Sequence, residues 1–346
     1  MDGISLCLTG CNQSKLFERS LVYLARQTLP REKWELIVID DYSSEDWPAL
    51  LEAYRSQIDI KYIRLIHDQG WRCCEVGFNL AFSEAKFDIL ASTNVHLILH
   101  PQALECLYLV HQSERAKKAQ GKLWASLRGY TITREDMPYF DTVNWQEELG
   151  NLKQLPHFDN PWTKLWTDPN KFYGSFLCCS FPKRLWFEEI AVKEHRGIVN
   201  QGPPGFPESF SYGACDPFFA GARRQAGWVD VNFDIEKVYF MHQDHYTHRE
   251  LATRFRAKSL LNEEGQSEIT APWWGQEWAP ENPDGFWPPP PVPWESYVPG
   301  SGKLPKLRPE FSHYYDPKWA KENAPWLVEE LEQSLKLHNP NAKVLG

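Results

Sequence analysis

Two adjacent carboxylates, Asp40 and Asp41, follow the apolar run WELIVI directly and stand before a serine-rich turn. A carboxylate at the end of a buried strand can accept hydrogen bonds from a nucleotide base or from ribose hydroxyls. The alternative is that one acid caps the next helix or tightens the turn. We interpret Asp40 as structural and Asp41 as the candidate for ligand binding.

Other polar residues that could bind a ligand or take part in a reaction are spread along the chain. Arg72 precedes a predicted helix, where a guanidinium can pair with diphosphate oxygens; an ordinary surface arginine is an equally good interpretation. Asn79 is expected to serve packing or capping. The segment VYFMHQDHYTHRE contains His242, His245 and His248, of which His248 is expected to be exposed.

The elements that would position these residues alternate between strand and helix. Apolar runs predict strands, and apolar residues at helical spacing predict helices. In chain order these are a strand at 4–9, a helix at 15–27, a strand at 34–39, a helix at 47–56, a strand at 60–66, a helix at 74–85 and a strand at 87–92. The alternation predicts a doubly wound α/β unit whose strands end at one rim, formed by 9–13, 40–44 and 93–96.

The second half of the chain has a less regular pattern. This half contains aromatic-rich loops such as NPWTKLW and a helical stretch near 216–227, and it is expected to complete the sheet and to form one side of the ligand site. Residues 272–309 are rich in tryptophan and proline, which predicts an extended arm packed across the domain, ending in a helix near 325–337. Rings of this size must be shielded from water, so we expect the arm to be ordered.

Composition restricts the classes of function. The formal net charge is -9, whereas a protein that binds nucleic acid is expected to carry an excess of Lys and Arg. Nucleic-acid binding is therefore not expected. The eight cysteines include no CxxC pair and are expected to be reduced and mostly buried in a cytoplasmic protein. The sequence shows neither a signal peptide nor an apolar run of about 18 residues, so peripheral membrane contact is the only membrane contact we expect.

Four segments in this order resemble the family 2 glycosyltransferases of the GT-A fold. They are LTGCNQ, LIVIDDYSSED, GWRCCEVGFNLA and ILASTNVHLILHPQAL, and the resemblance covers roughly the first 250 residues. It implies a Rossmann-like mixed sheet with helices on both faces. It also implies a nucleotide-binding half at 1–100, an acceptor half at 101–250 and a Pro/Trp-rich extension at 251–346.

The resemblance also implies roles for particular residues. Asp41 would contact the nucleotide of a UDP-sugar, with Thr9 and Cys11 flanking the base, although Cys11 stands where the family often has an aromatic residue. The family's DxD motif holds Mn2+ or Mg2+, and here the matching triplet is Asn94-Val95-His96. Imidazole is a good ligand for manganese or zinc, whereas an Asn oxygen is a weak one.

Two further positions complete the set of residues that the resemblance implies. In several family members a histidine from late in the sequence is a further ligand of the metal. His242 fits this position better than His245. The segment SYGACDPFFAGARRQAGW resembles the family's acceptor-facing helix, in which Asp216 keeps the second of two acids and would be the general base, while Cys215 replaces the first acid. Asp216 before Pro217 would also cap a helix.

The resulting hypothesis is an inverting, metal-assisted transfer of a sugar to a hydroxyl of a glycan or glycoconjugate. Two alternatives stay open. A catalytically inactive carbohydrate-binding relative would explain the missing acids and the many tryptophans, and a sugar nucleotidyltransferase would use a similar fold but needs a more glycine-rich first loop. A Rossmann dehydrogenase is disfavoured because no GxGxxG motif opens the first helix.

Overall fold

The computed structural model of the chain describes residues 1–10, 13–41, 45–64, 74–133, 135–167, 176–195, 198–200, 203–207 and 215–243. At 161, 162, 165, 177, 195, 198, 199 and 215–217 it describes the backbone alone. Five expectations fall wholly outside these residues: those on Cys11, Arg72, His245, His248 and the aromatic, proline-rich arm.

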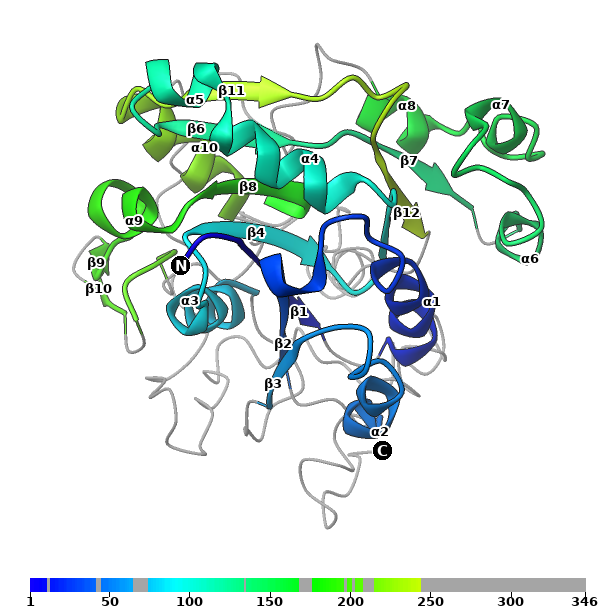
Figure 1. Cartoon of the computed structure of the whole chain (residues 1–346), viewed down its shortest axis with the longest axis horizontal. Coiled ribbons are helices and arrows are strands. Elements are labelled where there is room, and N and C mark those ends of the chain that lie inside the picture. The colour runs from blue at the N-terminus through cyan, green and yellow to red at the C-terminus, as the bar shows by residue number, and fades with distance from the viewer. Residues whose placement is uncertain are drawn as a thin grey trace, which may run out of the picture.

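A seven-stranded mixed sheet forms the centre of the molecule (Figure 1). Its strands, in spatial order, are β11 (Val229–Asn232), β6 (Leu123–Ser126), β8 (Cys179–Pro182), β4 (Ile89–Asn94), β1 (Ile4–Gly10), β2 (Trp34–Asp40) and β3 (Ile60–Arg64). Strand β8 runs antiparallel to both of its neighbours, and every other neighbouring pair is parallel.

Successive side chains of a strand point to opposite faces of the sheet, and the central strands are apolar on both faces. Helices therefore cover both faces of this sheet. Every residue of β2 is buried. One face packs against α1 (Ser14–Leu24), α2 (Trp47–Glu52) and α4 (Ala103–Leu109). The other packs against α3 (Cys74–Glu84) and α10 (Cys215–Gln225). The predicted mixed α/β sheet with helices on both faces is therefore confirmed.

A second sheet of three short strands lies beside the first in the chain's fold (Figure 1). It contains β5 (Leu97–Leu99), β12 (Phe240–Gln243) and β7 (Gly129–Ile132), with β12 in the middle. Strand β12 is antiparallel to β5 and parallel to β7. The sheet has its own aromatic core, which includes Tyr130, Trp145 and Tyr239.

The remaining elements are short. They are η1 (Arg31–Lys33), η2 (Val110–Gln112), α5 (Glu114–Lys118), α6 (Met137–Phe140), α7 (Leu149–Leu152), α8 (Pro161–Thr167), η3 (Phe176–Cys178), α9 (Lys183–Leu185), the π-helix η4 (Trp186–Ile190), β9 (Glu194–His195) and β10 (Ile198–Val199). None of the described helices is both long and apolar enough to span a bilayer.

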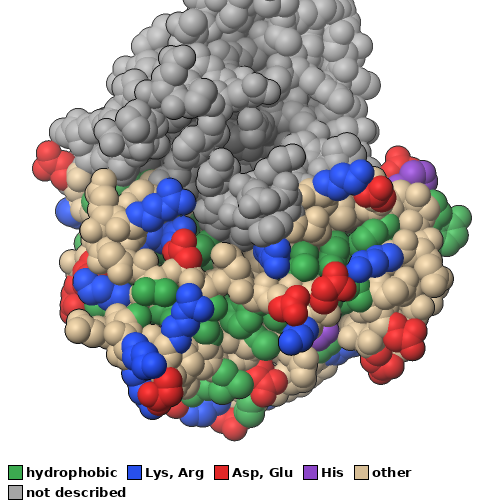
Figure 2. All heavy atoms as spheres, turned by 90° about the horizontal axis from the view of Figure 1, so that it is seen from above, with side chains coloured by type: hydrophobic (Ala, Val, Ile, Leu, Met, Phe, Trp, Pro, Cys, Tyr) green, Lys and Arg blue, Asp and Glu red, His purple; other side chains and the backbone are tan. Residues whose placement is uncertain are grey.

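Charges of both signs share the described surface. On the face in Figure 2, basic and acidic side chains are interspersed, with hydrophobic side chains in small groups between them. The cysteines at 7, 74, 106, 178 and 179 are free thiols, and three of them are buried. Burial raises the pKa of Cys7, Cys178 and Cys106, which favours the unreactive thiol form.

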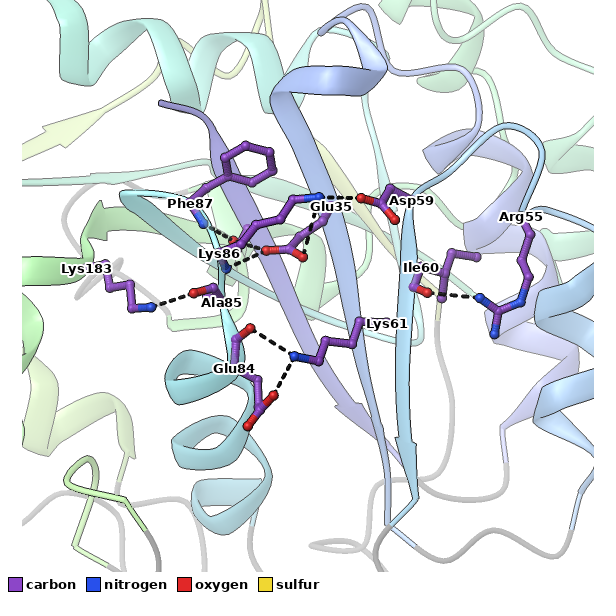
Figure 3. A network of polar contacts seen from close by, with 11 residues as sticks. Glu35, Arg55, Asp59, Ile60, Lys61, Glu84, Ala85, Lys86, Phe87 and Lys183 are labelled. Atoms are coloured by element: carbon purple, nitrogen blue, oxygen red, sulfur yellow. Dashed lines mark hydrogen bonds and ion pairs between the residues drawn. The ribbon is translucent and has the colours of Figure 1, made fainter. Parts of the chain in front are cut away.

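A buried carboxylate joins the beginnings of β1 and β2, at the opposite edge of the sheet from Gly10 and Asp40 (Figure 3). Glu35 is 4% exposed. Its Oε1 accepts hydrogen bonds from the Ser5 hydroxyl at 2.6 Å and from the Lys86 backbone N–H at 2.8 Å. The Ser5 hydroxyl in turn accepts from the Phe87 backbone N–H at 3.2 Å. This network connects β1, β2 and the chain entering β4.

Replacing Glu35 by Ala is expected to lower the free energy of unfolding by about 3 kcal/mol, because it leaves the buried Ser5 hydroxyl and the part-buried Lys86 N–H without their acceptor. Glu35→Gln keeps an acceptor oxygen of the same shape and should lower it by about 1 kcal/mol. Urea denaturation of both variants measures the difference. An Ala variant as stable as the Gln variant would contradict the role given to this carboxylate.

Candidate active site

The strand register brings the predicted rim residues together. Thr9 lies between Ile39 of β2 and Asn94 of β4, and Gly10 lies opposite Asp40. The Asp41 backbone N–H donates to the Gly10 carbonyl at 2.8 Å. The described ends of β1, β2 and β4 thus meet at one edge, where an α/β sheet binds its ligands.

Thr9 lies in a tight contact between β1 and α3. The residue is 7% exposed, and a Cβ placed on Gly77 would stand 2.5 Å from the Thr9 hydroxyl oxygen. Only a glycine at 77 allows α3 to come this close to the strand. The Thr9 side chain therefore packs against α3 below the rim, with its hydroxyl next to Gly77.

The two adjacent acids have different surroundings. Asp40 is buried, and its Oδ2 accepts a hydrogen bond from the Tyr62 hydroxyl at 2.6 Å and lies 3.8 Å from Arg64 Nε. Burial, and then the bond to Asp40, raise the pKa of Tyr62 well above its ordinary value, so the phenol stays protonated as the donor. Asp41 is half-buried at the strand end. Asp40 thus has a structural role, but it connects β2 to β3 and does not cap the next helix, which Asp46 does.

Asn79 makes a reciprocal pair of hydrogen bonds with the backbone of Phe206. Its Nδ2 donates to the Phe206 carbonyl at 2.9 Å, and its Oδ1 accepts from the Phe206 N–H at 2.6 Å. The side chain is fully buried. It thereby attaches α3 to the segment 203–207, in agreement with the packing role expected of it.

The two candidate metal ligands lie side by side although they are far apart in sequence. Asn94 ends β4, Val95 and His96 form a turn, and β5 begins at Leu97. Strand β12 pairs with β5 so that His242 lies opposite Leu97. The ring centroids of His96 and His242 are 4.9 Å apart, with their planes at 72°.

Polar contacts fix this turn against β12 and α1. The Gln243 N–H donates to the His96 carbonyl at 3.1 Å. The Gln243 side chain, fully buried, donates through Nε2 to the Leu16 carbonyl at 3.0 Å and lies 3.2 Å from the Ser20 hydroxyl, which is 2.7 Å from the Val95 carbonyl. These hydrogen bonds fix the backbone that carries the two histidines.

Sequence reasoning did not find Ser20, Gln243 or Gln13, whose Oε1 lies 3.4 Å from His96 Nδ1. All three are polar residues on or next to an amphipathic element, where solvent exposure is the ordinary expectation. The only signal was the position of Gln243 directly after the candidate ligand His242.

The donor set at this place consists of the two imidazoles, whose ring centroids lie 4.9 Å apart. Imidazole nitrogen is a ligand for divalent transition-metal ions. Within the described part of the chain, no group of three or more His, Cys, Asp or Glu side chains is placed to hold a metal. His96 and His242 are therefore the two candidate ligands that lie together within the described residues.

Helix α10 places Asp216 at its second position, and the backbone is described there without the side chain. The far end of this helix is firmly anchored. Arg223 is 1% exposed, its guanidinium lies 3.9 Å from the centre of the Trp124 ring, and it forms an ion pair with Asp230 of β11. Burial, and then the neighbouring Arg224, lower the pKa of Arg223 to about 10.

Comparison with known proteins identifies the type of domain. Residues 5–167 match the family model of Glycosyl transferase family 2. A chondroitin synthase from Pasteurella multocida (strain Pm70) is 32% identical over 89 residues, which is 26% of this chain and 9% of that protein. A Validoxylamine A glucosyltransferase from Streptomyces hygroscopicus subsp. jinggangensis (strain 5008) is 28% identical over 185 residues, 47% of this chain and 43% of that protein.

Among solved structures, the crystal structure of S. aureus TarS 1-349 in complex with UDP has a TM-score of 0.48 and 14% identity, covering 77% of this chain and 67% of that one. The chain spans less than half the length of the two curated relatives described above.

Proposed function

Because residues 5–167 form a glycosyl transferase family 2 domain, we propose that this chain transfers a sugar from a UDP-sugar to a hydroxyl of a glycan or glycoconjugate, with inversion at the anomeric carbon. The observation that carries the proposal is the contact between His96 and His242 at the sheet edge. Relatives that are a chondroitin synthase and a glucosyltransferase support sugar transfer as the reaction.

In this proposal the rim residues bind the donor. Asp41 accepts hydrogen bonds from the uridine, with Cys11 and the Thr9 strand end beside it, and Arg72 pairs with the diphosphate. His96 and His242 would hold a divalent ion, Mn2+ or Mg2+, with Asn94 at the same turn. Such an ion neutralises charge on a leaving diphosphate.

Asp216 is proposed as the general base. A sugar hydroxyl is a weak nucleophile at neutral pH, and a carboxylate that takes up its proton as the new bond forms raises the rate. The oxygen of the acceptor forms a bond to the anomeric carbon while the bond from that carbon to the UDP oxygen breaks. Attack from the side opposite the leaving group gives inversion.

The proposal is tested by incubating the purified chain with individual UDP-sugars, with Mn2+ or with chelator, and measuring thermal stability and UDP release. A bound donor at a hundred times its dissociation constant stabilises the fold by about 2.7 kcal/mol. We expect stabilisation and release of UDP only with the ion. Stabilisation without any UDP release, with or without acceptor, would instead indicate a sugar-nucleotide-binding relative.

Asp41→Ala is expected to raise the KM for the donor by about 10- to 100-fold while kcat changes little. A hydrogen bond from the nucleotide to a carboxylate is present alike in the ground and transition states, and bonds to charged groups contribute about 1.5–3 kcal/mol. Steady-state kinetics measure both constants, and Asp41→Asn, which keeps an acceptor oxygen, is the matched control. A fall in kcat alone would place Asp41 in catalysis.

A further inference from the structure

Trp166, from the aromatic segment NPWTKLW, lies against His242. The two rings are nearly parallel, with planes at 25° and centroids 6.0 Å apart, and the edge-to-face contact with His96 is a second ring contact of His242. We propose that Trp166 is a positioning residue that sets the ring plane of His242 beside His96. Its consequence for metal affinity rests on the proposed function.

The backbone of His242 is already fixed by its neighbours in the sheet. His242 lies opposite Leu97 on one side and Thr131 on the other, and the next residue donates its N–H to His96. What the sheet leaves open is rotation of the imidazole, since the χ2 torsion of histidine has a broad profile. A flat aromatic surface beside the ring restricts that rotation.

Trp166 can provide this surface because α8 is attached both to β7 and to Arg128, the residue before β7. The Thr163 hydroxyl donates to the Thr131 carbonyl at 3.0 Å and accepts from the Thr131 N–H at 3.3 Å. At the end of the helix, Arg128 Nη1 donates to the Thr167 carbonyl at 3.1 Å. Thr131 is also the residue paired with His242. The helix that carries Trp166 is therefore bonded to the same residue of the sheet that lies beside His242.

The Trp166 ring has its own support in the core. It meets the ring of Phe240 edge-to-face, with centroids 5.9 Å apart and planes at 74°. Phe240 is fully buried and lies two residues before His242 on β12, which places both side chains on one face of the strand. One indole therefore packs against two successive side chains of that face.

The positioning is tested first without metal, by NMR of protein carrying labelled histidine, with His242→Ala used to assign the resonance. A stacked indole shifts the His242 ring protons upfield through its ring current. We expect Trp166→Leu, which keeps an apolar side chain against Phe240, to remove the shift, and Trp166→Phe to retain part of it. His242 protons without an upfield shift in the unmodified chain would overturn the proposal even if the Leu variant does not fold.

The second measurement is calorimetric titration of UDP with Mn2+ and with chelator. Residues that orient a metal ligand typically contribute 10- to 100-fold to metal affinity. We expect Trp166→Leu to weaken the Mn2+-dependent part of UDP affinity by about 10-fold, with binding in chelator unchanged and Trp166→Phe closer to the unmodified chain. An Mn2+ effect of full size in the Leu variant would overturn the proposal.

The two measurements separate this inference from the proposed function. If the His242 ring protons are shifted upfield but the UDP affinity is the same with and without Mn2+, the ring positioning is supported and the metal role of the histidines is rejected. A strong Mn2+ effect that depends on His242 but not on Trp166 would do the reverse.

Discussion

His96→Ala is expected to remove most of the Mn2+-dependent affinity of the chain for UDP. The ring lies 4.9 Å from that of His242, so its loss leaves at most one of the two imidazoles of the proposed pair. Because the loss of a direct ligand exceeds the 10- to 100-fold effect typical of residues that only orient one, we expect at least about 100-fold weaker binding. Calorimetric titration with Mn2+ and with chelator measures it.

His100→Ala is the matched control for this variant. His100 lies on the same segment but contacts the Gln146 carbonyl and the Gln102 N–H, and burial lowers the pKa of its ring, as expected of a neutral core histidine. It should change stability and leave the Mn2+ effect intact. Equal UDP affinity with manganese and with chelator in the unmodified chain would reject metal-assisted binding altogether.

The parallel part of the fold could be predicted from the sequence because its strands are buried on both faces. Trp34–Asp40 is such a strand, and its apolar run needs no partner to be recognised. The flanking boundaries were less accurate. The strand predicted at 87–92 lies at Ile89–Asn94, and the helix predicted at 15–27 ends at Leu24, because capping bonds at Ala25 depend on local geometry that periodicity does not encode.

The three-stranded sheet could not be predicted for a different reason. Its strands β5, β12 and β7 have three or four residues each, too few for an alternating pattern to be distinguished from a loop. Their pairing joins parts of the chain that are distant in sequence. This sheet nevertheless determines how His242 meets His96, so the candidate ligands were recognisable from the resemblance while their contact was not.

The supporting residues show the same limit. Ser20 occupies a buried position of α1, and its hydroxyl has meaning only because Val95 and Gln243 are beside it in space. Trp166 belongs to an aromatic-rich segment in which any of several rings could have faced the core. Side chains that orient others are chosen by tertiary contact, and a single sequence does not record that contact.

Asp216→Asn is expected to lower kcat by about 10² to 10⁴ while UDP binding stays unchanged. The amide keeps the shape of the carboxylate but cannot take up a proton, and general base catalysis contributes this range of rate. The position at the start of α10 suits a charged base, since the N-terminal end of a helix stabilises an anion. Transfer assays with saturating donor measure kcat, and calorimetry measures UDP binding.

Cys215→Ser is the control for Asp216→Asn, because it changes the neighbouring residue of the same first turn. It should leave most of the activity, whereas a structural disturbance of the turn would lower activity in both variants. Arg223, buried against Trp124 and paired with Asp230, holds the other end of the helix in both. Direct attack also requires a β-linked product from an α-linked donor. An active Asn variant, or a product with the donor's own anomeric configuration, would exclude Asp216 as the base.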